Sequence, residues 1–451
     1  EDFLRDPDAR ALGFAVPVVD PVLGPTWQPA GPAAFSDTPV PAPRAAEPPG
    51  TSTAAVRAET PRWRRMASGP GTRPPRTCLE GIRVLDLTSF IAGPVCPMLL
   101  ADLGADVVKI ESAEGDPFRN AAFAFVGWNR GKRSLVVDLK RPEGRAVFLD
   151  LARSADVVVD NLRAGVMDRL GIGWDTLRTL NPRLIHLSIT GYGTGGPLAS
   201  LPGFDPIFQA RSGLSRTQGG ADEPVFHIVA YNDYCGGALG ALAAVAALVA
   251  RERTGRGQRV DVSLFRMAFV DQAAEMILHA GRTAWPGGGR DYLGPAACQR
   301  LYACRDGWLA IVATTAEAAA ALGRLAGVAI GLDDPADGSA ATAVARVLGE
   351  ELRAHALDRL AAAGVPAAPC LTFEELWADE HLQANGCFAE TEDPTLGRVV
   401  QGSALLHFEA TPIGPPRTAP QLGADGAQVL RELGYDDERI AALRAARVVG
   451  P

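Results

Sequence analysis

The sequence predicts an α/β protein whose large domain holds a doubly wound, mostly parallel sheet, with a smaller α+β domain inserted. Two observations support this fold class. Short runs rich in β-branched residues, such as DVVKIE and DVVVD, alternate with helical segments from residue 79 onward. Runs of this kind fit strands buried on both faces, and their alternation with helices is typical of parallel sheets. The second is length, because 451 residues exceed one ordinary core and indicate two or three domains.

The elements of the large domain follow one another in strand and helix order. The first strand is predicted at residues 82–88, and Pro94 begins the helix after it, since proline is tolerated in a first helical turn. Ligands of such sheets bind at the carboxyl ends of the strands. Further strands are predicted at residues 106–111, 134–139, 156–160, 184–190 and 258–263, and further helices at residues 142–154 and 234–251.

The domain organisation is predicted to have five segments. After the large domain, the Asp306-Gly307 turn between two apolar runs predicts a hairpin in the small domain. A stretch rich in proline and arginine reads as a linker, because it cannot bury enough apolar surface to fold. The predicted segments are residues 1–50, a linker at 51–78, the large domain at 79–283, the small domain at 284–345, and a return to the large domain at 346–451.

The beginning of the chain and a segment near its end are similar in sequence and form an internal repeat. Residues 1–50 align with residues 374–423 without a gap, and sixteen positions are identical. The shared frame is a short helix, a strand, a D-P-x-L-G turn and a second strand. A period this long indicates duplicated domains rather than a solenoid. We expect residues 1–50 to be the tail of a preceding, similar unit in a tandem protein.

Composition excludes several function classes. The net charge of -8 argues against nucleic acid as a partner. Seven cysteines without C-x-x-C spacing indicate reduced thiols and a cytoplasmic protein, and six histidines show no metal-ligand spacing. The apolar stretch at residues 236–250 is shorter than the roughly 20 residues of a membrane span, so a buried helix is expected.

Asp233 is the acidic residue at the start of that apolar helix. The loop after the first strand has neither G-x-G-x-x-G nor a Walker pattern, and no G-x-S-x-G motif occurs. On local sequence alone Asp233 is favoured as an N-cap. A helix N-terminus also stabilises a carboxylate anion, so an ionised nucleophile is the alternative interpretation of Asp233.

Four segments with preserved order and spacing, together with the closing stretch VLRELGYDDERIAALRAARVV, resemble the class III CoA-transferase family, also called CaiB/BaiF or formyl-CoA transferase-like. The resemblance spans residues 79–451 and implies interlocked homodimers. The segments are LEGIRVLDLTSFIAGPVCPMLLADLGADVVKIE, NRGKRSLVVDLKRPEGR, DNLRAGVMDRLGIGW and ERTGRGQRVDVSLFRMAF.

The resemblance implies that Asp233 is catalytic. Its carboxylate would attack the thioester of an acyl-CoA donor, form a mixed anhydride and then an aspartyl-CoA thioester, and pass coenzyme A to a carboxylic acid. Coenzyme A would thus be a substrate, and no permanently bound cofactor or metal is expected. The partners are the acyl-CoA and the acid, with no nucleic acid and no membrane.

The same resemblance implies the substrate contacts. The first loop would line the pantetheine, two cations would suit the phosphates, and a mobile glycine loop would shield the intermediate. Phe204 and Trp285 would join Phe90 as an apolar wall of the acceptor pocket. The implied binding residues are Ser89, Phe90, Ile91 and Ala92 (pantetheine), Lys140 and Arg169 (phosphates), Asn161 and Leu162 (adenine), Asp205 (near the catalytic centre), Gly287, Gly288 and Gly289 (mobile loop), and Val137 (coenzyme A, with no part of it specified).

Two alternatives to the transferase stay open. An α-methylacyl-CoA racemase shares the fold, but it needs a second base where this chain has Phe204, which cannot exchange a proton. A non-catalytic CoA-binding half of a tandem protein is the other, since duplicated units often keep one silent copy. We expect a homodimer, or an intramolecular pseudo-dimer with a preceding unit.

Overall fold

The computed structural model describes residues 2–5, 7–31, 33–41, 43–58, 75–283, 287–404, 406–414 and 417–450. It divides into two compact units. The larger comprises residues 1–217, 224–286 and 389–451, and the smaller comprises residues 218–223 and 287–388. The boundary predicted at residue 345 falls inside helix α14, Ser339–Gly349, because the helices beyond it pack on the small sheet. Most of the predicted linker lies outside the described residues.

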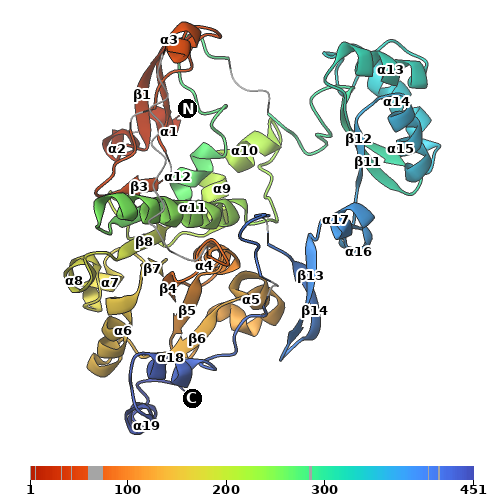
Figure 1. Cartoon of the computed structure of the whole chain (residues 1–451). Coiled ribbons are helices and arrows are strands. Elements are labelled where there is room, and N and C mark those ends of the chain that lie inside the picture. The colour runs from red at the N-terminus through yellow and green to blue at the C-terminus, as the bar shows by residue number, and fades with distance from the viewer. Residues whose placement is uncertain are drawn as a thin grey trace. The chain divides into compact units, whose positions relative to one another are not determined.

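A seven-stranded sheet forms the centre of the larger unit, in the order β3-β9-β8-β7-β4-β5-β6 (Figure 1). All neighbours pair in parallel except β3, which runs antiparallel to β9. The predicted α/β fold with a parallel sheet is confirmed. The strands are β3 (Ala33–Phe35), β4 (Arg83–Leu87), β5 (Asp106–Glu111), β6 (Arg133–Val136), β7 (Val157–Asp160), β8 (Ile185–Thr190) and β9 (Arg259–Ser263).

Helices cover both faces of this sheet, and one hydrophobic core lies under each set. Successive residues of β7 belong to different cores, since Val157 and Val159 pack with α4 and α11 while Val158 packs with α6 and α8. The helices of the larger unit are α4 (Ala92–Asp102), α5 (Ala122–Asn129), α6 (Pro142–Ser154), α7 (Val166–Arg169), α8 (Trp174–Leu180), α9 (Asp205–Arg211), α11 (Tyr231–Thr254), α12 (Leu264–Val270), α18 (Gly426–Glu432) and α19 (Asp437–Ala445), with the 3-10 helix η1 (Pro117–Asn120) and the short helices α1 (Asp2–Arg5), α2 (Pro7–Ala11) and α3 (Thr53–Ala58).

Glycines at the start of α11 let it lie directly against α4. A Cβ on Gly237 would come within 2.8 Å of the Ala92 carbonyl oxygen and 2.7 Å of the Val95 Cβ. Real side chains do not approach this closely, so only glycine fits. The close packing brings the N-terminal ends of both helices together, and these ends form one side of the site.

Helix α11 is long and apolar enough to cross a membrane by length and composition alone. Half of its most apolar window is buried inside the protein. Gly240, Ala244 and Ala247 are buried in this helix, on the core that it shares with α4. The packing is that of a core helix.

The smaller unit has a core of its own between a three-stranded antiparallel sheet and three helices. The predicted hairpin with its Asp306-Gly307 turn is β10 and β11, and β12 pairs with β11. The elements are β10 (Gln299–Cys304), β11 (Gly307–Val312), β12 (Ala367–Cys370), α13 (Ala316–Ala326), α14, α15 (Arg353–Ala362), α16 (Phe373–Ala378) and α17 (Glu380–Ala384); α10 (Leu214–Gly219) lies at the boundary between the units.

The two copies of the sequence repeat fold alike. The first contains the hairpin β1 (Ala15–Asp20) and β2 (Gly24–Pro29), and the second contains β13 (Phe388–Asp393) and β14 (Gly397–Gly402) at the equivalent positions. Both turns are closed by their aspartate. Asp20 Oδ1 accepts hydrogen bonds from the backbone N–H groups of residues 22 and 23, and Asp393 Oδ1 from those of residues 395 and 396, at 2.9–3.0 Å.

Candidate active site

Two loops diverge where the strand order reverses, after β4 and after β7. Asn161, directly after β7, holds the loop after β4 by both ends of its carboxamide. Its Oδ1 accepts from the Ser89 N–H at 3.0 Å, and its Nδ2 donates to the Ser89 carbonyl at 2.7 Å. This is the place where ligands bind in open α/β sheets. Asn161 was predicted to lie near the adenine, and in the structure its carboxamide positions the loop.

Phe90 follows Ser89 in a strained conformation, with φ at +68°. A residue with a Cβ seldom adopts this region, and such strain clusters at functional sites. The ring is 39% exposed and makes edge contacts with Phe204, at a centroid distance of 5.4 Å, and with Phe118 at 6.2 Å. The loop therefore presents an aromatic surface, formed by the two phenylalanines that were predicted to line the acceptor pocket, Phe90 and Phe204. Trp285 lies outside the described residues.

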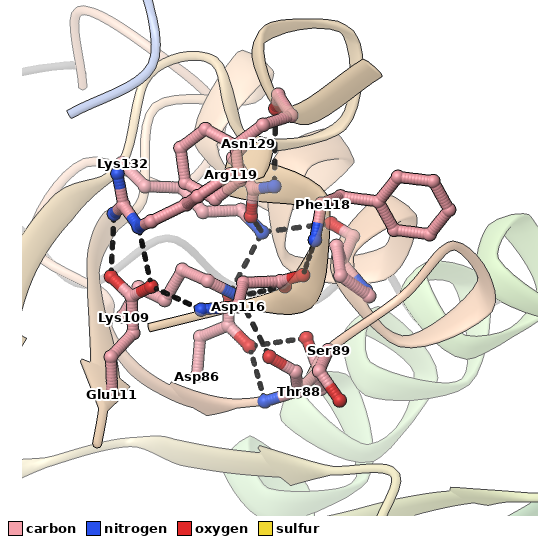
Figure 2. A network of polar contacts seen from close by, with 12 residues as sticks. Asp86, Thr88, Ser89, Lys109, Glu111, Asp116, Phe118, Arg119, Asn129 and Lys132 are labelled. Carbon is pink, nitrogen blue, oxygen red and sulfur yellow. Dashed lines mark hydrogen bonds and ion pairs between the residues drawn. The ribbon is translucent and has the colours of Figure 1, made fainter. Parts of the chain in front are cut away.

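A buried ionic network underlies this loop (Figure 2). Lys132 Nζ donates to Asp86 Oδ2 at 2.8 Å and to the Pro94 carbonyl at 2.9 Å, and Lys109 Nζ donates to the Thr88 carbonyl at 2.7 Å. Burial favours the neutral carboxyl, but the two lysines hold the pKa of Asp86 below its usual range. Burial lowers the pKa of Lys132 to about 8. The network thus ties β4, the loop and the first turn of α4 together.

The outer half of the network fixes η1. Lys109 pairs with Asp116 at 3.1 Å, and Asp116 caps η1 by accepting from the Phe118 N–H at 3.0 Å. Arg119 makes two hydrogen bonds to Glu111, at 2.8 and 2.6 Å. Figure 2 shows the side chains of Lys109, Glu111, Asp116 and Arg119 close to one another. They hold Phe118 beside Phe90.

Asp233 lies in the first turn of α11 and is 8% exposed. Asp205, at the start of α9, is buried and accepts at Oδ1 from the N–H and the side-chain amide of Asn232, both at 2.8 Å. Its other oxygen accepts from Gln209. Asp205 therefore fixes the turn that carries Asp233. The N-cap of α11 is Ala230, so the prediction that Asp233 caps this helix is wrong because the helix begins earlier.

The pKa of Asp233 is raised to about 7, first by burial and then by the nearby Asp205 charge. Burial and the Asp205 charge therefore favour the protonated carboxyl, whereas the position at a helix N-terminus was expected to favour the ionised form. A carboxyl with a pKa near 7 is both a stronger nucleophile than an ordinary aspartate and still half ionised at neutral pH.

Asp233 opens into a cavity of about 290 Å³, here called the Asp233 cavity. Six of its lining residues were predicted from the sequence and belong to the first loop and to the loop after β7. The only cation among its lining residues is Arg163, which the sequence analysis did not single out. The predicted residues that line it are Ser89, Phe90, Ile91, Ala92, Asn161, Leu162, Phe204 and Asp233.

A second cavity of about 880 Å³, here called the long cavity, is also lined by Ser89 and Leu162. Val137 and Lys140 line it, as do Arg444 and Arg447 near the C-terminus of the described chain. The last two were not predicted, because nothing in the sequence places the end of the chain beside β6.

Other predicted residues lie elsewhere. Arg169 is exposed on α7 and lines none of the described cavities. Gly287, Gly288 and Gly289 belong to the smaller unit, where a Cβ on Gly288 would come within 2.2 Å of the Gln218 carbonyl oxygen. Among the described residues no cluster of His, Cys, Asp and Glu could hold a metal ion.

Comparison with known proteins identifies the family, because residues 79–426 match the sequence profile of CoA-transferase family III. The chain belongs to CoA-transferase family III. It is 31% identical over 401 residues to succinyl-CoA–D-citramalate CoA-transferase of Chloroflexus aurantiacus, covering 84% of this chain and 99% of that enzyme. It is 33% identical over 398 residues to succinate–glutarate CoA-transferase of Agrobacterium fabrum, covering 82% and 98%.

Solved structures agree with this assignment. A crystal structure of a CaiB/BaiF family protein from Brucella suis superposes with a TM-score of 0.71 and 30% identity, covering 79% of this chain and 99% of that one. The predicted family and its enzymatic class are thus confirmed. This family III member is a CoA-transferase, which moves coenzyme A between an acyl-CoA and a carboxylic acid.

Proposed function

We propose that Asp233 is the nucleophile of this transfer. Its carboxylate oxygen attacks the carbonyl carbon of the donor thioester, and the C–S bond breaks. The products are a mixed anhydride between Asp233 and the donor acyl group, and coenzyme A as a free thiolate. The thiolate then attacks the aspartyl carbonyl and releases the donor acid. The acceptor carboxylate reverses both steps, so Asp233 is regenerated and no net proton is consumed.

The observation that carries this proposal is the placement of Asp233. It is the only carboxylate among the residues lining the Asp233 cavity. The loop after β4, whose backbone is held by Asn161, lines the same cavity. Partial burial keeps water from the anhydride and from the thioester, both of which water would hydrolyse. Phe204 lines the same cavity and no histidine does, which favours the transferase over a racemase.

We further propose that the substrates are dicarboxylic acids and their CoA thioesters. The relatives named above act on succinyl-CoA with D-citramalate and on succinate with glutarate. Arg163 supports this reading, since no ion pair or hydrogen bond of its side chain is found within the described part of the chain. A guanidinium there can bind the distal carboxylate of a dicarboxylate, while Phe90 and Phe204 pack on its methylene carbons.

We propose that a second unit of the same kind completes the assembly, either as a homodimer or as a pseudo-dimer within a longer protein. The repeat supports this, because the first hairpin packs on this unit, with the Trp27 N–H donating to the Leu278 carbonyl at 2.9 Å. The second hairpin would take the same place on another unit. We place the enzyme in the cytoplasm, with coenzyme A as substrate rather than as a resident cofactor.

The test is a comparison of two carboxylate variants with succinyl-CoA as donor and a panel of dicarboxylic acids as acceptors. We expect Asp233→Asn to lose more than about a thousandfold in kcat, because covalent catalysis is removed. The control is Asp271→Asn, whose carboxyl has a pKa raised by burial to about 6 but lines neither cavity. If Asp271→Asn lost activity while Asp233→Asn kept it, Asp233 would not be the nucleophile.

A further inference from the structure

Two residues other than glycine have a positive φ in the described part of the chain, and each lines one of the two cavities. Phe90 lines the Asp233 cavity, and Arg447, with φ at +54°, lines the long cavity. This backbone region favours glycine, because a Cβ crowds the carbonyl oxygen there. An arginine at such a position lowers the stability of the fold relative to glycine. The presence of its side chain therefore points to a role other than stability.

The strained residue lies at the turn that joins α19 to the end of the chain. The Arg447 N–H donates to the Arg444 carbonyl at 2.8 Å and closes the helix. Beyond it the chain adds to the free edge of β6, where the Val448 carbonyl accepts from the Asp138 N–H at 2.9 Å and the Gly450 N–H donates to the Val136 carbonyl at 3.1 Å. This pairing holds Arg447 at the wall of the long cavity.

The lining of the long cavity has an excess of positive charge once its internally paired acidic residues are set aside. Glu111 is engaged by Arg119, and the charge of Asp116 by Lys109. What remains on the lining is Glu114 and Asp138 against three cations, Lys140, Arg444 and Arg447.

Two of these cations have charged groups free for a ligand. The Arg444 Nε is used on the Gly450 carbonyl, at 3.2 Å. The guanidinium of Arg447 and the ammonium of Lys140 are exposed, and no hydrogen bond or ion pair of either group is found among the described residues. The ammonium of Lys140 acts on the Glu114 carboxylate through its charge. An exposed guanidinium beside an ammonium is suited to phosphate oxygens.

We propose that Arg447, together with Lys140, binds a phosphate at the nucleotide end of coenzyme A. The inference rests on the proposed function, and it adds a contact from the C-terminal segment that the sequence did not indicate. The two cavities share Ser89 and Leu162 in their linings, so one extended ligand can reach from Asp233 to Arg447. The strain at Arg447 is retained because the cation binds phosphate.

Arg447→Gly separates the two properties of this residue. Glycine adopts φ +54° without strain, so the melting temperature should stay unchanged or rise, while the cation is lost. We expect the Kd of coenzyme A, measured by calorimetry, to rise about tenfold, and the Kd of pantetheine, which lacks the nucleotide, to stay the same. 3′-Dephospho-CoA identifies the phosphate, because a variant effect that disappears with this ligand assigns the 3′-phosphate, and one that persists assigns the diphosphate.

Arg447→Lys is the matched control, since it keeps the charge and the strained backbone. It should retain most of the affinity for coenzyme A. The proposal is overturned if Arg447→Gly binds coenzyme A as tightly as the unaltered protein, or if it weakens pantetheine by the same factor. These binding measurements need no turnover. A protein that binds coenzyme A through Arg447 but transfers nothing would refute only the proposed function.

Discussion

The ionisation of Asp233 should set the acid side of the pH–rate profile. Its pKa is raised to about 7, by burial first and by Asp205 second. Because only the carboxylate attacks the thioester, activity follows its ionised fraction, which is half at pH 7 and about 1% at pH 5. The value of kcat/KM should therefore fall about fiftyfold between these two pH values.

Asp205→Asn tests the cause of that shift. The asparagine Oδ1 can still accept from the Asn232 N–H, so this bond of the turn is kept, while the negative charge and the bond from Gln209 are removed. We expect the pKa of Asp233 to fall and the acid limb of the profile to move to lower pH.

The assay is kcat/KM for CoA transfer from pH 5 to pH 8 in buffers of constant ionic strength. A profile that is flat between pH 5 and 7 in the unaltered enzyme would refute the argument, and so would an unmoved limb in Asp205→Asn. A limb that moves to higher pH would show that the charge of Asp205 acts in the opposite sense.

Three further predictions concern the framework of the site. Gly237→Ala should lower the melting temperature and reduce kcat/KM more than tenfold, because its Cβ meets the Ala92 carbonyl oxygen, whereas Gly349→Ala, with open space around it, should do neither. Asp86→Asn should lower the free energy of unfolding by about 3 kcal/mol in urea titrations, because two buried lysines lose their shared counter-charge; an effect below 1 kcal/mol would contradict this. Asn161→Ala removes two hydrogen bonds to the Ser89 backbone and should cost about 1–3 kcal/mol and raise KM for acyl-CoA, and an unchanged KM would exclude a role in positioning the loop.

The pH dependence of stability follows from the same carboxyl. The pKa of Asp233 in the folded protein lies above its unfolded value near 4, so the folded state holds this proton more tightly. Its contribution to stability is complete below pH 4 and is lost as the pH rises toward 7. The difference in unfolding free energy between Asp233→Asn and the unaltered protein should therefore grow in favour of the variant from pH 4 to pH 7.

The parallel sheet could be predicted from sequence because its strands are buried on both faces. Runs such as those of β5 and β7 are continuous and apolar, and the helix predicted at residues 142–154 has the bounds of α6. Strand β3 could not be predicted, because three residues carry no periodic signal and pair with β9 far along the chain.

Parts of the site depend on contacts that no local pattern contains. Asp233 was found through the family resemblance, and its raised pKa depends on Asp205 and on burial by other elements. The positions of Arg444 and Arg447 depend on the pairing of the chain end with β6. The clamp by Asn161 joins loops that the sequence separates by 72 positions, so its role became clear only from the structure.

The most direct test of the central claim is to trap the covalent enzyme intermediate. The protein is incubated with succinyl-CoA and hydroxylamine, digested, and examined by mass spectrometry. We expect a hydroxamate on the peptide that contains Asp233, at a level that depends on the donor and is absent from Asp233→Asn. A hydroxamate on another carboxylate, with the Asp233 peptide unmodified during active turnover, would contradict the account.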